Sequence, residues 1–192
     1  MKRLVSLIVM AICCLSMSAQ VNPDSIKFDD QGEFSIVVPT KANARQIFLY
    51  SQAYFRSNDP VLKTKIELTD SVSHKVQVHT SFAGDDFNLT INSGTVNQMF
   101  TTEHVLLTVI AKDNRFKVKV ERSNFEYDNY ILGRKMGHEV NRPYFGYVGM
   151  GEKFSGVENL KATINKNRAK RFADRINKMV EYIEKQIADE DF

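Results

Sequence analysis

Alternating apolar and polar residues run through the first two thirds of the chain and predict a series of short strands. The first clear strand covers 33–38, with Phe34, Ile36 and Val38 on one face. The same period appears at 25–28 and in five later runs, at 65–68, 76–82, 87–91, 105–109 and 116–120. The tight turn Lys112-Asp113-Asn114 joins the last two runs, which predicts a hairpin over 105–120. A polar second face along these runs is typical of an antiparallel sheet covered on one side.

Two segments change to a helical period. The first covers 41–56, with Thr40 as the expected N-cap and Pro39 closing the strand before it. The second covers roughly 160–188 and should bury Phe172, Ile176, Val180 and Ile183 against the sheet. We expect its basic residues to form the solvated side: Lys166, Arg168, Lys170, Arg171 and Arg175. The pattern therefore predicts one α+β domain, a curved antiparallel sheet with both helices on one face.

The segment between the strands and the final helix has no clear period. Residues 126–157 hold six of the nine glycines and four of the seven tyrosines. A connection of this length is long for a loop inside a compact domain. It is either an excursion that carries function or a hairpin that the pattern does not reveal.

The N-terminus has the layout of a secretory signal peptide. Lys2 and Arg3 precede an apolar run, and small residues lead to Ala19 before Gln20. We therefore expect 1–19 to be removed and the remaining chain to be periplasmic or secreted. The leader holds two of the 26 basic residues and none of the 23 acidic ones, which leaves 24 against 23 and a net charge of +1. That balance argues against a protein that binds nucleic acid or another acidic polymer.

The cysteines change the chemistry that is open to the mature chain. Cys13 and Cys14 both lie in the expected leader, so the mature chain has no disulfide, thiolate metal site or cysteine nucleophile. Neither cysteine follows a small residue, which argues against a lipoprotein. The expected organisation is 1–19 as leader and 20–192 as one domain. Within it, 30–127 is the core, 128–157 the Gly/Tyr-rich connection and 158–192 the segment of the last helix.

The order of these elements resembles a known family. It runs from Phe34-Ser35-Ile36-Val37-Val38, through a helix with Ile47-Phe48-Leu49-Tyr50 and Tyr54-Phe55, to a meander that ends in the 109–118 turn region. This succession resembles exported bacterial domains of unknown function with a TATA-binding-protein-like (TBP-like) fold. The resemblance covers roughly 30–127 and implies a curved, helix-grip-like sheet. It brings no catalytic residues, and a fold name alone does not make a nearly neutral chain a DNA binder.

Searches for catalytic and metal-binding motifs give little. His138-Glu139 begins like a zinc-protease helix, but position 142 is Arg rather than His, and we interpret the pair as part of a polar loop. His104 is expected at the surface at the start of a strand, and Gly84-Asp85-Asp86 is expected to be an ordinary turn. We predict no catalytic residue, no metal and no cofactor.

Composition points to one candidate binding segment. Tyr130, Tyr144, Phe145 and Tyr147 lie among glycines and either offer flat rings of the kind found in binding sites or cap one open end of the core. Two hypotheses remain for function. The first is a non-enzymatic envelope protein that binds a small ligand or glycan in a cleft between the final helix and the sheet. The second is a module that docks another envelope protein, and an envelope hydrolase is a weaker third. A closed cavity would favour the first and an exposed aromatic patch the second.

Overall fold

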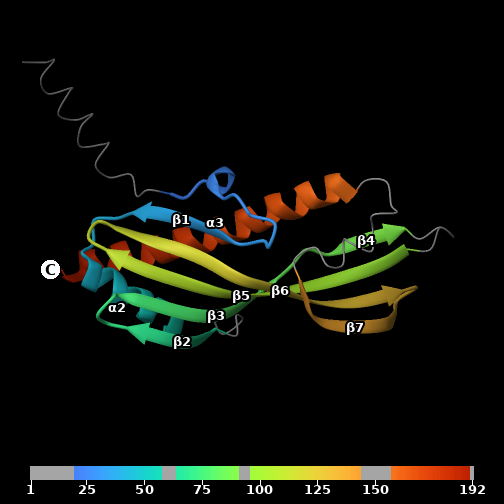
Figure 1. Ribbon diagram of the computed structural model, residues 1–192, viewed down its shortest axis with the longest axis horizontal. Coiled ribbons are helices and arrows are strands. Elements are labelled where there is room, and N and C mark those ends of the chain that lie inside the picture. Colours follow the sequence, from blue (N-terminus) through green and yellow to red (C-terminus); the bar gives the residue numbers. More distant parts are fainter. Residues whose placement is uncertain (1–19, 58–63, 91–95, 144–156, 191–192) are drawn as a thin grey trace, which may run out of the picture.

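The structure, a computed structural model, describes residues 20–57, 64–90, 96–143 and 157–190 (Figure 1). The elements follow in the order η1 (Pro23–Ser25), β1 (Phe34–Pro39), α2 (Ala44–Ser57), β2 (Lys65–Asp70), β3 (Lys75–Ala83), β4 (Phe87–Thr90), β5 (Val96–Lys112), β6 (Arg115–Ile131), β7 (Arg134–Pro143) and α3 (Val157–Glu190). Within these residues no helix is both long and apolar enough to cross a membrane. The expected leader 1–19 lies outside them.

One antiparallel sheet holds all seven strands. Its order is β1-β6-β5-β3-β2, while β4 pairs with β5 and β7 pairs with β6. The 17-residue strands β5 and β6 form its spine. Their register shifts where Val105 faces both Arg122 and Ser123, and Arg122 takes a φ of 53° at this bulge. We call β1, β2, most of β3 and residues 105–122 the near half, and β4, β7 and residues 96–104 and 123–131 the far half.

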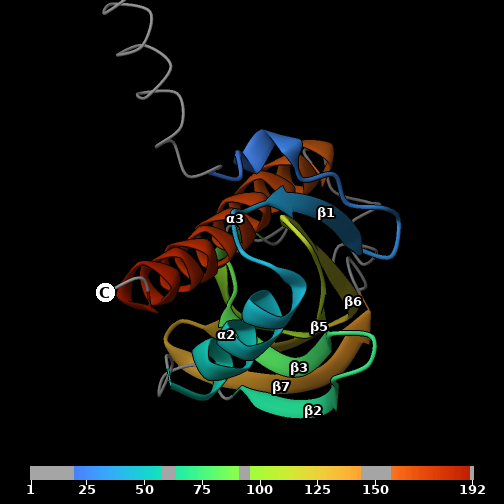
Figure 2. The same ribbon diagram turned by 90° about the vertical axis from the view of Figure 1, so that its left-hand side faces the viewer.

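Both helices cover the same face of this sheet, as the sequence predicted. Seen from one end, the sheet curls around α2, and α3 crosses the same side (Figure 2). Alternate residues of the near-half strands meet the helices, for example Val76 and Val78 of β3 and Val118 and Val120 of β6. The predicted stripe on α3 is confirmed, since its members are all buried: Phe172, Ile176, Val180 and Ile183.

The predicted 105–120 hairpin is confirmed. Lys112 pairs with Arg115, and Asn114 adopts a φ of 62°, a left-handed conformation that Asn tolerates better than most residues. Asp113 uses its Oδ1 to accept a hydrogen bond of 2.8 Å from the backbone N–H of Ala44. The turn therefore also holds the start of α2 in place.

The early helix begins later than predicted, and Thr40 is not its cap. Asn43 Oδ1 accepts from the Gln46 N–H at 2.9 Å, and Gln46 Oε1 accepts from the Asn43 N–H at 3.1 Å. This reciprocal pair is a capping box, which satisfies two amides at the start of α2. Thr40 instead accepts a long 3.4 Å bond from the Ala42 N–H. The prediction of Thr40 as the N-cap is wrong because the chain needs several residues after Pro39 to turn into the helix.

One other prediction needs correction. Residues 25–28, predicted as a strand, form none: Ser25 ends the short helix η1, 26–28 follow it without pairing, and Ile26 is buried by contact with the core rather than by a sheet. Of the two alternatives for the connection without a clear period, part of it is the hairpin, because β6 continues to Ile131 and β7 returns to Pro143. Its turn and two register shifts along β7 break the alternation that would have revealed it.

Candidate functional site

The far half of the sheet contains a buried ion pair. Arg168 of α3 and Glu103 of β5 are both fully buried, and Arg168 Nε donates to both Glu103 oxygens at 3.0 Å. The prediction that Arg168 and Arg175 lie on the solvated side of the helix is wrong. Arg175 is 8% exposed, and its guanidinium lies 5.1 Å from the centre of the Phe82 ring. Both arginines fall on the apolar stripe because α3 crosses a part of the sheet that offers polar and aromatic partners.

Several further contacts surround the pair. Arg168 Nη2 donates to the Gly32 carbonyl and to Ser123 Oγ, each at 3.1 Å. The guanidinium also lies 4.2 Å from the centre of the Phe28 ring. A buried charge pair needs such extra bonds to offset its desolvation. This network links α3, the sheet and the strand-free segment before β1, and it fixes where the helix crosses the far half.

A second contact joins α3 to the β3–β4 connection. Arg171 Nη1 donates to Asp85 Oδ1 at 2.9 Å, and Asn167 Nδ2 donates to the same oxygen at 3.0 Å. Asp85 is therefore more than the turn residue that the sequence predicted. Gly84 beside it donates its N–H to the Thr101 carbonyl at 2.7 Å, and a Cβ at Gly84 would lie 2.0 Å from Thr101 Oγ1.

A chain of polar side chains crosses the uncovered face of the sheet. Ser81 Oγ lies 2.8 Å from His104 Nδ1, and His104 Nε2 lies 2.9 Å from Glu126 Oε2. The other Glu126 oxygen lies 3.1 Å from His138 Nε2. His138 is thus a strand residue of β7 that faces β6, and not part of a loop as predicted. His104 lies inside β5 rather than at its start, and Glu103 beside it is buried.

Asp128 completes this chain at the far end. Its Oδ1 lies 2.7 Å from His138 Nδ1 and 2.6 Å from Lys135 Nζ. The hydrogen bond from Lys135, and secondarily the one from His138, hold the pKa of Asp128 below its ordinary value. The pairs bridge strands β3, β5, β6 and β7, so they help to fix the register of the far half.

The Ser81–His104–Glu126 chain has the residue types of a hydrolytic triad, for which the position of oxyanion donors is a second requirement. Such chemistry needs backbone N–H groups or other donors aimed at the developing oxyanion. Ser81 lies within β3 and pairs with His104 of β5, and strand N–H groups lie in the plane of the sheet rather than above it. Among the described residues, no three His, Cys, Asp or Glu side chains are arranged to hold a metal ion.

Tyr130 is the only predicted binding residue within the described chain. It lies near the end of β6, half-buried, and its ring meets Phe100 of β5 edge-on at a centroid distance of 5.4 Å. Phe100 remains 45% exposed. Tyr144, Phe145 and Tyr147 lie outside the described residues, so their role stays a prediction. The sequence did not single out Phe100 because it extends a strand beyond the clearly alternating run.

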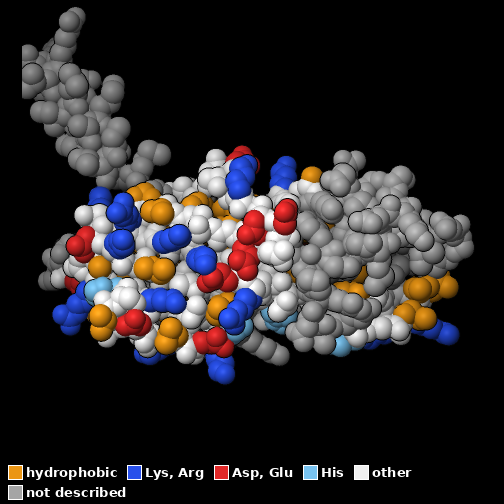
Figure 3. Space-filling model, viewed as in Figure 1, with side chains coloured by type: hydrophobic (Ala, Val, Ile, Leu, Met, Phe, Trp, Pro, Cys, Tyr) orange, Lys and Arg blue, Asp and Glu red, His pale blue; other side chains and the backbone are white. Residues whose placement is uncertain are grey.

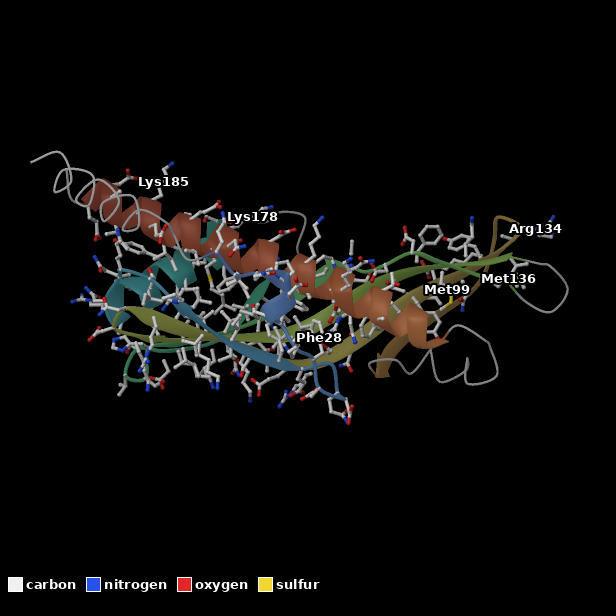
Figure 4. All side chains as sticks on the ribbon, turned by 90° about the horizontal axis from the view of Figure 1, so that it is seen from above. Phe28, Met99, Arg134, Met136, Lys178 and Lys185 are labelled. Carbon is white, nitrogen blue, oxygen red and sulfur yellow. The ribbon has the colours of Figure 1, made fainter. Side chains whose placement is uncertain are left out.

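The β6–β7 hairpin brings two more apolar side chains to this end, Leu132 in its turn and Met136 on β7. Leu132 is 87% exposed and Met136 is 63% exposed. Hydrophobic side chains gather at this tip in Figure 3, and Figure 4 shows Met136 and Arg134 at the far end of the sheet. We call Phe100, Tyr130, Leu132 and Met136 the far-end surface.

The far-end surface contains a strained leucine. Leu132 and Gly133 have φ values of 50° and 75°, the left-handed pair of a two-residue hairpin turn. Asn or Gly usually occupies the first of these positions, because a left-handed conformation costs other L-residues roughly 1–2 kcal/mol. An exposed leucine there is unfavourable for folding in two ways.

A cleft of about 800 Å³ lies on another side of the molecule, between the 22–28 segment and α3. It is open to solvent, and core side chains occupy the space between α3 and the near half of the sheet. The predicted location for a ligand, between the final helix and the sheet, is therefore filled in the near half. The hollow is formed by the helix and the segment that precedes β1.

Comparisons with known proteins find distant structural similarities. No family model and no curated protein matches the sequence. The solved structures that this chain resembles include a DUF4468 family protein from Bacteroides ovatus, with a TM-score of 0.46, 12% identity, and coverage of 86% of this chain and 92% of that one. A TBP-like protein from Parabacteroides distasonis has a TM-score of 0.45 and 12% identity, over 83% and 97% of the two chains. A protein from Arthrobacter aurescens has a TM-score of 0.30 and 13% identity, over 85% and 93%.

The first two names fit the resemblance predicted from the sequence, a bacterial domain of unknown function with a TBP-like fold. The predicted fold class, a curved antiparallel sheet with an early and a C-terminal helix, is confirmed. The likeness concerns fold alone, so function has to be argued from the surface of this chain.

Proposed function

We propose that this chain is an exported, non-enzymatic interaction module that docks another protein of the cell envelope through the far-end surface. The observation that carries the proposal is Leu132, an exposed leucine held in a left-handed turn conformation. Strain and exposed apolar area both lower the stability of an isolated domain. Leu132 does not stabilise the isolated domain, but it would contribute apolar contact area to a partner that covers it.

The residues around Leu132 support a protein partner. Phe100, which is 45% exposed, and the half-buried Tyr130 form an edge-to-face pair, and Met136 adds a flexible apolar side chain. Tyr and Met are among the residues enriched at protein interfaces. Asp128, Lys135 and His138 lie next to this group and pair with one another. The result is an apolar centre with a charged rim, the usual layout of a protein interface.

The alternative hypothesis, a small ligand or glycan in a cleft, has a different requirement. A ligand site normally encloses most of its ligand. The predicted place for such a ligand, between α3 and the near half of the sheet, is filled by core side chains, whereas Phe100 and the tip leucine are exposed. These features favour the docking of a protein over the enclosure of a ligand as the main function.

Replacing Leu132 with asparagine tests the proposal, because strain and docking predict opposite effects. Asn adopts the left-handed conformation readily, so Leu132→Asn should raise the free energy of unfolding by about 1 kcal/mol. The same change should abolish partner capture in a pull-down of the mature chain from envelope extract. Urea unfolding and quantitative mass spectrometry measure the two effects.

Val72→Asn is the matched control, since Val72 is 91% exposed in the β2–β3 turn of the near half. It should leave both stability and capture unchanged. Equal capture by the Leu132→Asn variant and the wild type would remove the basis of the proposal. So would a clear loss of stability, because Leu132 would then be a packing residue.

A further inference from the structure

The 22–28 segment, which forms one wall of the cleft, has a defined orientation relative to α3. Asn177 Oδ1 accepts from the Val21 N–H at 2.7 Å, and Asn177 Nδ2 donates to the Val21 carbonyl at 3.2 Å. Seven residues later, the Phe28 ring lies beside Arg168 and 6.2 Å from the Phe172 ring. The segment therefore runs antiparallel to α3, and Figure 4 shows Phe28 near the middle of that helix.

This direction separates the charges that line the cleft. Asp24 and Asp174 belong to the end near Asn177, while Lys27, Lys166 and Lys170 belong to the end near Phe28. Ile26, Phe28 and Ala169 line the space as well, and Ile26 and Ala169 are almost fully buried. The cleft thus has an acidic end, an apolar wall and a basic end.

The spacing of the two ends defines the length of a matching ligand. The outermost charges on α3, at positions 166 and 174, are eight residues apart, which corresponds to about 12 Å along the helix axis, and Lys170 lies midway between them. An extended peptide spans roughly 3.3–3.6 Å per residue, so about three or four residues cover that distance. The volume of about 800 Å³ lies within the usual range for small-molecule sites.

We infer that this cleft binds a short peptide with free ends, of about three or four residues with small apolar side chains. The ligand's ammonium group lies at Asp24 and Asp174, and its carboxylate lies at Lys166 and Lys170. The side chains of the ligand contact Phe28 and Ala169. This site is separate from the far-end surface, so it adds a ligand to a protein whose proposed function is docking.

Calorimetric titration of the mature chain with tri-alanine tests the inference. We compare the free peptide with its N-acetylated and its C-amidated forms at low salt. Each blocked end should weaken binding about two- to fivefold, the size expected for loss of an exposed charge pair. Raising the salt concentration should weaken binding of the free peptide in the same direction.

Charge reversal on the helix tests the position of the site. Lys166→Glu combined with Lys170→Glu should weaken binding about tenfold, because both changes replace attraction by repulsion at one end. Lys185→Glu is the matched control, since Lys185 is exposed on the same helix outside this cleft. The control should bind tri-alanine like the wild type, and both variants should keep the wild-type circular dichroism spectrum and melting temperature.

Three results would overturn the inference. Equal binding of the free and blocked peptides would show that the charged ends are not recognised. Full competition by acetate or phosphate alone would make the cleft a site for simple anions. Absence of any heat or chemical-shift change with tri-alanine would show that the cleft does not take this class of ligand.

Discussion

The two halves of the long β5–β6 hairpin differ in what they place against the helices. In the near half, the covered face holds Leu107, Val109, Val118 and other apolar residues, all buried. In the far half, the corresponding positions include Thr101, Glu103 and Ser123. Opposite them, α3 places a buried arginine that binds Glu103. One continuous pair of strands therefore changes from an apolar core to a polar network at the bulge opposite Val105.

This difference means that one half supplies most of the folding stability and the other half fixes the geometry of its elements. Burial of apolar area dominates folding free energy and has no preferred direction, so the near half can supply most of the stability. A buried ion pair contributes little net stability, but it tolerates only one arrangement of its partners. The far half is thus held in a defined geometry, while its outer side exposes Phe100 and Leu132. We interpret the near half as the folding core and the far half as the presenting platform.

The largest expected effect comes from the aromatic cluster beneath α3. Phe172 lies 5.1 Å from the Phe34 ring and 5.0 Å from the Phe82 ring, and it is 1% exposed. Phe172→Ala should lower the free energy of unfolding by about 3–5 kcal/mol, as truncation of a buried aromatic does. Urea unfolding measures the loss. Phe100→Ala is the control on the outer side, with an expected loss of about 1 kcal/mol or less.

The buried ion pair gives a comparable effect with a different signature. Glu103→Leu leaves Arg168 buried without its carboxylate and should cost about 3 kcal/mol or more. Adding Arg168→Met to the same chain should recover most of that loss, because no uncompensated charge then remains. If the double variant is as unstable as the single one, the pair stabilises the far half more than this interpretation allows.

A smaller effect tests the close approach of the β3–β4 connection to β5. Gly84→Ala would place a Cβ 2.0 Å from Thr101 Oγ1, an atom that already donates to the Asp85 carbonyl at 2.7 Å. We expect a loss of about 1–3 kcal/mol from this overpacking, measured by thermal unfolding. Gly137→Ala on β7 is the matched control, because the nearest atom that its Cβ would meet is 4.0 Å away. Equal melting temperatures for the two variants would contradict the expected clash.

The smallest effect lies at the near end, where a tyrosine on α2 meets the end of α3. Burial, and secondarily the nearby Glu190 carboxylate, raise the pKa of Tyr50 to about 12 from its ordinary value of 10.0. The folded chain keeps this proton after the unfolded chain has lost it. The resulting stabilisation is present below pH 10 and disappears as the pH rises toward 12 and beyond.

Ultraviolet absorbance at alkaline pH measures the ionisation of Tyr50 directly. Tyr50→Phe should remove a tyrosine titration near pH 12 and weaken the loss of stability between pH 10 and 12. An unchanged titration curve in the variant would contradict the assignment to Tyr50.

The near half was predicted well from the sequence because its apolar residues repeat with the regular periods of strands and helices. Alternation located β1, β3 and the 105–120 hairpin, and the helical stripe located Phe172 and Ile183. The far half follows the same periods, but with residues that look like surface residues. Glu103 lies in phase with Val105 and Leu107, and Arg168 lies one helical turn before Phe172. Glu103 and Arg168 each lie in phase with an apolar face, and this was the sequence signal for a buried ion pair. The signal can be interpreted only once it is known that β5 and α3 pack against each other.

The candidate site was harder to predict for a physical reason. Tyr130 was found from composition, but its neighbours Phe100, Leu132 and Met136 come from three separate parts of the sheet and its turn. Leu132-Gly133 is an unusual turn pair, so it did not mark a hairpin as Asn-Gly would have done. The strain that now distinguishes Leu132 is visible only in its backbone angle.

The most direct test of the central claim is site-specific photo-crosslinking in the cell that makes this protein. A photo-reactive phenylalanine analogue is introduced at position 132 in the far half or at position 72 in the near half, two positions with similar exposure. We predict one discrete crosslinked partner protein from position 132 and none from position 72. Crosslinking from neither position, or the same products from both, would contradict the assignment of recognition to the far half.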